Sequence, residues 1–154
     1  MLGFYMSFKC AHFDALDTRT LFTIMRGRVD VFVVEQTCPY PELDEVDINP
    51  STQHLYAIAD NSLLAYARCY EKNEQYSAIG RVLVCKSERG KGRATELVNA
   101  AIACCKKQWP QRHIYIGAQT YLLAFYRSFG FTEVGEQYLE DGIPHQDMVL
   151  NTLS

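Results

Sequence analysis

The sequence lacks the short patterns that mark several common classes of protein. It has no CxxC pair, which excludes a zinc ribbon and a thioredoxin-type redox motif. No apolar run approaches the ~20 residues that a membrane-spanning helix needs. The first residues, MLGFYMSF, have no charged segment followed by a long apolar core and a small-residue cleavage site. We therefore expect neither secretion nor a membrane partner.

A large excess of charge is also missing. The formal net charge is only −3, from 15 basic and 18 acidic residues. Nucleic-acid binding needs a basic surface, so we expect no nucleic-acid partner. The 154 residues, 48% of them hydrophobic, fit one domain spanning residues 1–154 that buries its own core.

The cysteines show no disulfide framework. Two of the six are adjacent, in a segment that reads as a helix, where neighbouring side chains point in different directions. We expect reduced, mostly buried thiols in a cytoplasmic protein. The six are Cys10, Cys38, Cys69, Cys85, Cys104 and Cys105.

The order of the predicted elements defines a fold class. Apolar residues at helical spacing over 94–105 predict one long helix that ends before Trp109-Pro110. Earlier in the chain, we expect a helix capped by Asp17, followed by a break or a second short helix over 29–34 and a loop over 36–52. A short helix over 121–129 is expected to end at Gly130. Strands are predicted over 7–13, 54–59, 63–70, 76–84, 114–118, 131–136 and 145–150.

This order gives an α/β (α+β) fold, with a mixed central β-sheet flanked by helices on both faces. The strands over 76–84 and 114–118 are joined by the long helix, so we expect them to be parallel.

A glycine-rich turn precedes the long helix. Gly90 and Gly92 let the backbone approach a ligand closely, and free N–H groups at a helix start favour anions. Four basic side chains lie in or beside the turn, which favours a phosphate ligand, and they are Lys86, Arg89, Lys91 and Arg93. The turn does not fit a Walker loop, and Thr95 replaces the third glycine of a dinucleotide fingerprint. A plain helix start with solvated basic residues is the alternative.

The turn does fit the Q/R-x-x-G-x-G/A pattern through Arg89, Gly92 and Ala94, and here the chain resembles the GNAT acetyltransferases. Tyr126, Gly130 and Phe131 match the end of a second GNAT motif, whose Asn and Ala positions hold Gln119 and Leu122. Further segments resemble the ElaA subfamily over roughly residues 20–150, namely 32–36, 38–40, 66–68, 79–82, 117–119 and 140–145.

The resemblance implies an acetyl-CoA-dependent N-acetyltransferase that needs no metal. Its fold would hold acetyl-CoA in a cleft between two splayed parallel strands, and the acetyl group would pass directly to a primary amine of a small molecule or peptide. The cofactor contacts implied are Val82, Leu83, Val84, Arg89, Gly90, Lys91, Gly92, Arg93, Ala94, Thr95, Gln119 and Tyr126. An acyl-CoA-binding sensor or interaction protein without turnover, a protein N-acetyltransferase, and a homodimer through an edge strand are left open.

The resemblance suggests a catalytic acid, whereas the catalytic base is left open. The resemblance makes Tyr126 the acid that protonates the leaving thiolate. The strand over 76–84 has no carboxylate, so the base is open among Glu35, His54 and His145, or a water-mediated route. The acidic loop of Glu42, Asp44, Glu45 and Asp47 is either solvated or an acidic rim that attracts a cationic amine.

Overall fold

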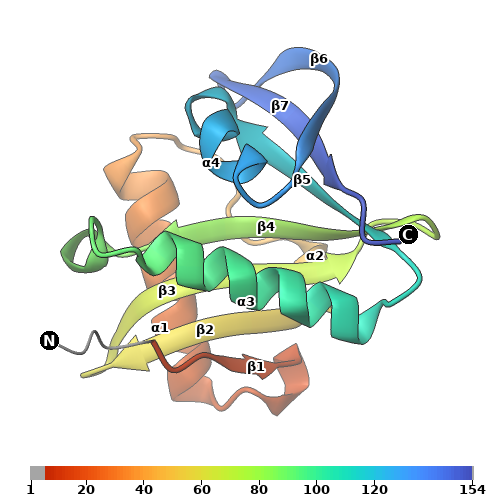
Figure 1. The fold of residues 1–154 in the computed structure, drawn as a ribbon. Coiled ribbons are helices and arrows are strands. Elements are labelled where there is room, and N and C mark those ends of the chain that lie inside the picture. Colours follow the sequence, from red (N-terminus) through yellow and green to blue (C-terminus); the bar gives the residue numbers. More distant parts are fainter. Residues whose placement is uncertain (1–5, 154) are drawn as a thin grey trace, which may run out of the picture.

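A computed structural model describes residues 6–153. Seven strands form one sheet in the order β1-β2-β3-β4-β5-β7-β6 (Figure 1). The pairing of β4 with β5 is parallel, as the sequence predicts, and every other neighbouring pair is antiparallel. The strands are β1 Lys9–Ala11, β2 Gln53–Ala59, β3 Ser62–Glu71, β4 Tyr76–Val84, β5 His113–Gln119, β6 Thr132–Glu140 and β7 Ile143–Leu150.

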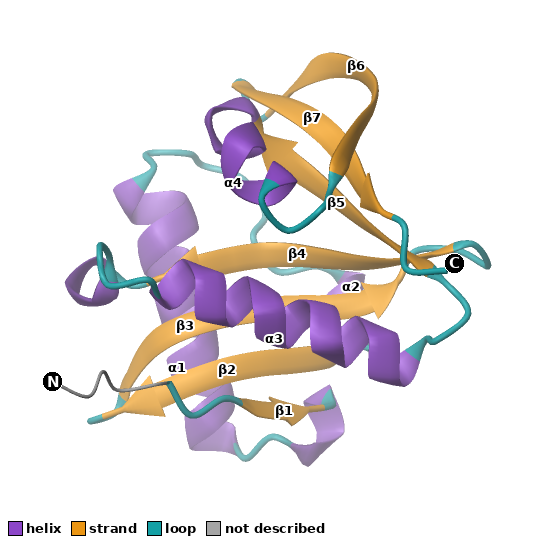
Figure 2. Cartoon of the chain, in the orientation of Figure 1, coloured by secondary structure: helices purple, strands orange, loops and turns teal. Residues whose placement is uncertain are grey.

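The helices cover both faces of the sheet (Figure 2). Helix α3, Arg93–Gln108, crosses one face over β3 and β4, and α1, Thr18–Arg28, packs on the other face against β3. The short helices are α2, Glu45–Ile48, and α4, Leu123–Arg127. Single 3-10 turns span Phe13–Ala15, Lys86–Glu88 and Thr120–Leu122.

Helix α3 supplies one side of the main core. Five of the six residues in the predicted apolar stripe are buried, and they are Leu97, Val98, Ala101, Ile102 and Cys105. They pack on inward-facing residues of the sheet, among them Leu55, Ala67 and Ile114. The helix ends at Gln108 before Trp109-Pro110, because proline restricts the residue before it.

Two segments differ from the sequence expectation. Residues 29–34 belong to a second short helical segment, one of the two alternatives expected, but this segment, Val29–Glu35, is π-helical and follows α1 directly. The expected loop 36–52 contains α2, because the Asp44 carboxylate accepts from the Val46 N–H at 3.1 Å and Asp47 accepts from the Asp44 N–H. These side-chain caps start a helix that has too few residues to show an apolar stripe.

All six cysteines are free thiols, as expected, but only three are buried. Cys10 is exposed on the short edge strand β1, and its sulfur lies 3.6 Å from that of Cys104 on α3. Among residues 6–153, no helix is both long and apolar enough to cross a membrane.

Candidate active site

Strands β4 and β5 separate along their length. They pair only between Tyr76–Ala78 and His113–Tyr115, and beyond this point they diverge (Figure 1). From Ile79 to Val84, β4 keeps β3 on one side and pairs with no residue of β5 on the other. A cavity of about 610 Å³ lies along this gap, lined from β4, β5, β7 and the loop before α2.

A β-bulge shapes the β4 wall of the cavity. The register between β3 and β4 shifts between Tyr66 and Arg68, where Arg81 has a positive φ of 52°. A left-handed backbone at a non-glycine residue is costly and persists where surrounding contacts hold it. The bulge turns Arg81 toward the cavity and the acidic loop.

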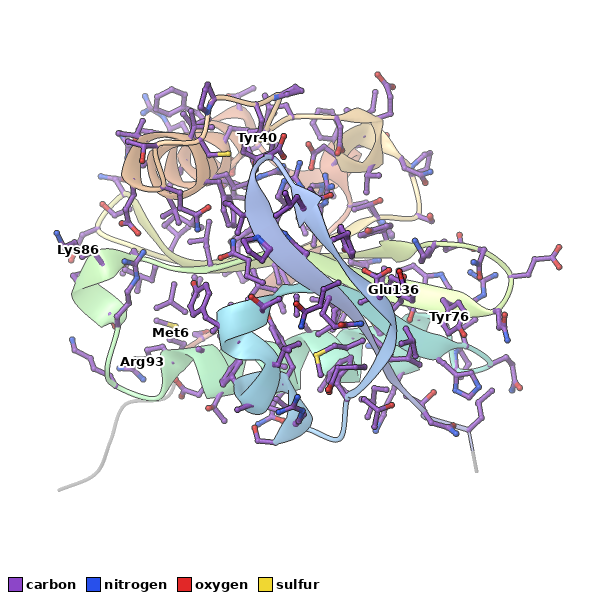
Figure 3. All side chains as sticks on the ribbon, turned by 90° about the horizontal axis from the view of Figure 1, so that it is seen from above. Met6, Tyr40, Tyr76, Lys86, Arg93 and Glu136 are labelled. Carbon is purple, nitrogen blue, oxygen red and sulfur yellow. The ribbon has the colours of Figure 1, made fainter. Side chains whose placement is uncertain are left out.

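The glycine-rich turn leads from β4 into α3. Gly90 and Gly92 both have φ of 77°, which side chains rarely adopt, and an added Cβ at either would meet nothing within 4 Å. Gly92 is the N-cap of α3 and supplies no side-chain cap to the first N–H groups. Seen from above, Lys86 and Arg93 lie at this end of the molecule and Tyr76 at the other (Figure 3). The turn is open, as an anion site requires.

Acidic side chains accompany the basic residues of this turn. Glu35 binds Arg89 at 2.7 Å, and Glu88 lies 3.1 Å from Lys91 and 3.4 Å from Arg93. Glu88 lies within the turn itself, whereas the pairing of Glu35 with Arg89 joins distant segments and has no local sequence signal. A polyanion here would bind in competition with, or beside, these carboxylates.

The predicted cofactor residues lie in two groups. The side chains of Val82, Gln119 and Tyr126 line the cavity, whereas the residues of the glycine-rich turn lie beyond it at the start of α3. Leu83 points to the α1 side of the sheet, where it packs with Ile24. Only the backbone of Leu83 is therefore available to a ligand in the gap.

Tyr126 on α4 is a protonated phenol. It is buried, with its ring edge-on to Phe125 and Phe131 at centroid distances of 5.2 and 6.0 Å. Burial raises the pKa of Tyr126 to about 12. At neutral pH it therefore carries a proton toward the cavity that it lines.

His145 lies in the same cavity on β7, in register with Gln119 of β5. Its Nδ1 is 2.7 Å from the carbonyl oxygen of Ile143. A carbonyl only accepts, so Nδ1 holds the proton and Nε2 of the neutral ring has a free lone pair. Nε2 lies 3.5 Å from a carboxylate oxygen of Glu140, which would stabilise the ring after it gains a proton.

The other two candidate bases lie elsewhere. Glu35 is not among the residues that line the cavity, and its carboxylate pairs with Arg89. His54 is fully buried on β2, where Nε2–H donates to the Asp47 carbonyl at 2.9 Å and Nδ1 accepts from the Tyr66 hydroxyl at 2.6 Å. Both ring nitrogens of His54 are occupied, so the geometry favours His145.

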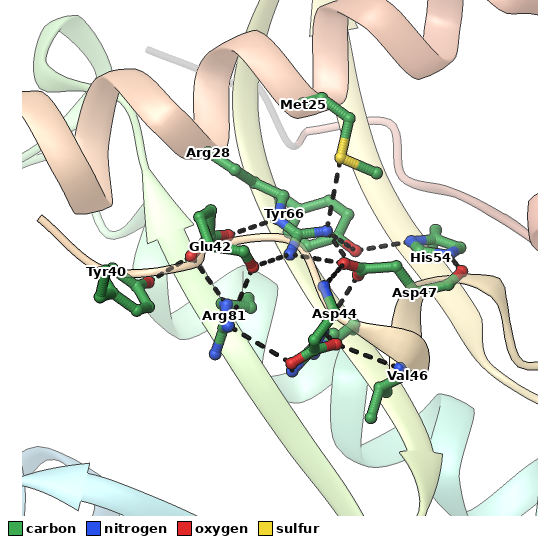
Figure 4. Close-up of polar contacts among 11 residues, drawn as sticks. Met25, Arg28, Tyr40, Glu42, Asp44, Val46, Asp47, His54, Tyr66 and Arg81 are labelled. Carbon is green, nitrogen blue, oxygen red and sulfur yellow. Dashed lines mark hydrogen bonds and ion pairs between the residues drawn. The ribbon is translucent and has the colours of Figure 1, made fainter. Parts of the chain in front are cut away.

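Of the four acidic residues in the loop, Glu45 is exposed, as a solvated loop predicts, whereas Glu42, Asp44 and Asp47 pair with arginines and form neither a solvated loop nor an acidic rim. Glu42 and Asp47 are 4% and 3% exposed, and three arginines neutralise them together with Asp44 (Figure 4). Arg28 from α1 binds Glu42 at 2.6 Å and Asp47 at 2.6 Å. For these three residues both sequence interpretations failed, because nothing local in the sequence shows that arginines on α1, β3 and β4 converge on this loop.

The remaining contacts of this network join the loop to the sheet. Arg68 of β3 binds Asp44 at 2.7 Å and Asp47 at 3.0 Å, and Arg81 of β4 binds Glu42 at 2.8 Å. Burial alone would raise the pKa of Asp47, but hydrogen bonds from Arg28 and its charge outweigh this and hold the pKa below its usual range. The network fixes the loop as one wall of the cavity.

Sequence reasoning also missed a polar group on the floor of the cavity. Asp147 follows His145 by two residues on β7, so both face the same side of the sheet. The hydroxyls of Tyr115 and Tyr138 donate to its carboxylate. The alternation of His145 and Asp147 along a predicted strand was the available signal.

Comparison with known proteins defines the class. A family model described as an acetyltransferase (GNAT) domain matches residues 25–152. A crystal structure of an acyl-CoA N-acyltransferase from Pseudomonas aeruginosa superposes with a TM-score of 0.91 at 38% identity, covering 96% of this chain and all of that one. The chain therefore belongs to the GNAT acetyltransferase family.

Two further comparisons refine the assignment. Protein ElaA of Escherichia coli (strain K12) is 38% identical over 139 residues, which are 89% of this chain and 91% of that protein. The crystal structure of Escherichia coli ElaA has a TM-score of 0.89 at 36% identity and covers 95% of this chain and 100% of that one. The chain is a member of the ElaA-like subfamily.

Removing Arg28 should destabilise the protein strongly. In Arg28→Met, buried Glu42 and Asp47 lose their main countercharge, which we expect to cost about 3–5 kcal/mol of unfolding free energy. Urea unfolding measures this. The control Arg127→Met removes an exposed ion pair with Glu133 and should cost at most about 1 kcal/mol. Equal losses in the two variants would contradict a structural role for the network.

His54 should make stability depend on pH near neutrality. Burial lowers the pKa of His54 in the folded state, so the unfolded chain binds this proton first as pH falls below about 6.5. The stability from neutral His54 is complete above that pH. It declines below it by at most about 1.4 kcal/mol per pH unit. Urea unfolding between pH 7 and 5 should show a shallower decline for His54→Gln than for the wild type. An unchanged slope would show that His54 is not responsible.

Proposed function

We propose that this chain, acting as one domain, transfers an acetyl group from acetyl-CoA to a primary amine of a small molecule or peptide. The amine would attack the thioester directly. The observation that carries the proposal is that a protonated tyrosine, Tyr126, and a histidine with a free Nε2, His145, line one cavity beside an unpaired stretch of β4.

The residues present fit coenzyme A. The unpaired edge of β4 from Ile79 to Val84 offers backbone groups to the amides of a pantetheine arm. Gly90 and Gly92 leave open space at the start of α3, where N–H groups and Arg89, Lys91 and Arg93 would hold the pyrophosphate. When bound, acetyl-CoA supplies the activated acyl group.

The chain's own groups then move two protons. An aliphatic ammonium has a pKa near 10.4 in water and must lose a proton before it attacks. His145 Nε2 is the acceptor for this proton, and Glu140 balances the resulting charge. Tyr126 donates its phenolic proton to the departing thiolate. The tyrosinate then regains a proton from the amine nitrogen, which gives up its second proton as the amide forms. A thiol of pKa near 8.5 also leaves without this help, so we assign Tyr126 the smaller catalytic effect.

A second candidate is an acyl-CoA-binding sensor without turnover. The absence of any carboxylate on β4, from Tyr76 to Val84, is the observation that favours it. The two candidates share the coenzyme A site and differ in whether an amine is consumed. A screen of primary amines with acetyl-CoA separates them, because a sensor would bind coenzyme A and release no free thiol with any amine.

Coenzyme A binding tests what both candidates share. In Gly92→Asp, strain at φ of 77° and a carboxylate beside the pyrophosphate should weaken coenzyme A at least about tenfold, as measured by calorimetric titration. Gly135→Asp is the matched control, since Gly135 has φ of 71° and equally open surroundings on β6. Binding by Gly92→Asp as tight as by Gly135→Asp would contradict the assignment of the turn.

Kinetics of two variants test the acid and base. Tyr126→Phe should lower kcat about 100-fold with little change in KM for acetyl-CoA, because only the proton donor is lost. His145→Gln should lower kcat at neutral pH by about 100-fold or more and recover part of the loss at high pH, where free amine is abundant. A loss in His145→Gln that does not vary with pH would remove His145 as the base.

A further inference from the structure

Three carboxylates that line the cavity, those of Glu140, Asp141 and Asp147, have no lysine or arginine partner among residues 6–153. Of the three, Asp147 is the one that accepts hydrogen bonds from two tyrosines. Asp147 lies in the middle of β7 and lines the cavity opposite Gly117 of β5. Within residues 6–153, no ion pair to Asp147 is present, whereas Asp44 in the same cavity pairs with Arg68 and Arg81. The ammonium of Lys72, which also lines the cavity, lies over the ring of Tyr115 at 4.4 Å from its centroid.

Two tyrosines hold this carboxylate in one orientation. The Tyr138 hydroxyl donates to Oδ1 at 2.5 Å, and the Tyr115 hydroxyl donates to Oδ2. Burial and these hydrogen bonds to Asp147 raise the pKa of both tyrosines, so each keeps its proton and its donor role. A carboxylate oxygen accepts more than one hydrogen bond, so both oxygens keep capacity for a further donor.

The surroundings leave room for that donor. A Cβ on Gly117 would lie 3.0 Å from the Tyr138 hydroxyl and 3.5 Å from Asp147 Oδ1. Glycine at this position therefore lets the Tyr138 hydroxyl and the Asp147 carboxylate lie close to the β5 backbone, and Asp147 faces the cavity that it lines. The Tyr115 ring already carries the Lys72 ammonium on one face, and the Tyr138 ring stacks on His145 at a centroid distance of 5.8 Å. The carboxylate oxygens of Asp147 are therefore the groups that a further donor would bind.

Asp147 is separate from the proton-transfer group. It is two residues from His145 on the same face of β7, about 7 Å along the strand. When one amine of the acceptor loses its proton to His145, the Asp147 carboxylate is therefore still available to bind a second, positively charged group of the same molecule. A short aliphatic chain with an amine at each end has this spacing.

We propose that Asp147, oriented by Tyr115 and Tyr138, binds a second, non-reacting ammonium group of the acceptor. The acceptor class is then an aliphatic diamine or polyamine. This inference rests on the proposed function, because it assigns the acceptor end of the same cavity. In this proposal, a cationic substrate binds Asp147 on β7 and not the acidic loop, where arginines neutralise Glu42, Asp44 and Asp47.

Binding of two matched amines tests the inference. We would titrate 1,4-diaminobutane and n-butylamine into the full chain saturated with coenzyme A, at neutral pH, by calorimetry. Wild type should bind the diamine about 10- to 100-fold more tightly, the usual effect of a hydrogen bond to a charged group. Asp147→Asn, which keeps the shape, should reduce this ratio to near one. Tyr138→Phe should reduce it partly, because one orienting donor is lost.

The control is Glu136→Gln, which removes a negative charge from β6 outside the cavity lining and should keep the wild-type ratio. Thermal unfolding verifies that each variant is folded. Equal affinity of the wild type for the two amines, or an undiminished ratio in Asp147→Asn, would overturn the inference. This readout needs no turnover. Absence of acetylation with every amine would refute the proposed function, while a diamine preference abolished by Asp147→Asn would still support the assigned subsite.

Discussion

The parallel pairing of β4 and β5 ends after three residues, and the candidate site depends on that limit. Backbone N–H and C=O groups inside a sheet need partners, and two strands that diverge leave theirs facing a gap. On the sides facing away from the gap, β5 forms hydrogen bonds with β7, and β4 forms them with β3. The backbone groups of β4 and β5 that face the gap can therefore form hydrogen bonds with water or with a ligand that has amide groups of its own. The cavity between β4 and β5 thus arises from a break in the hydrogen bonding of the sheet itself.

Ion pairs from several elements hold the loop that forms one wall of the cleft. Arg28, Arg68 and Arg81 come from α1, β3 and β4, and all three bind carboxylates of one loop. The bulge that gives Arg81 a positive φ is part of the same arrangement, since its guanidinium binds the Glu42 side chain and carbonyl. Replacing one arginine would leave a buried carboxylate without its countercharge, so the stability of the network depends on each of the three arginines. It places Tyr40 and Asp44 on the cavity surface as fixed groups.

Features that depend on neighbours in the chain were predictable from the sequence. The stripe on α3, the proline after it, the left-handed Gly130 and the parallel strands on either side of α3 all follow from spacing and local stereochemistry. Features that depend on distant partners were not. The buried state of Glu42 and Asp47, the pairing of Glu35 with Arg89, and the two tyrosines at Asp147 each join segments far apart in the sequence. One chain read alone holds no signal for such pairings.

The buried network has a consequence for the electric field inside the cleft. Its three guanidinium groups and three carboxylates sum to zero charge and are spaced by a few ångströms. Such an arrangement has no monopole, and the potential of the higher multipoles falls off faster with distance than that of a single charge. The network therefore exerts little electrostatic force on a molecule that approaches the mouth of the cavity. Long-range attraction or repulsion of ligands is left to the few charges on the cavity wall that lack a partner.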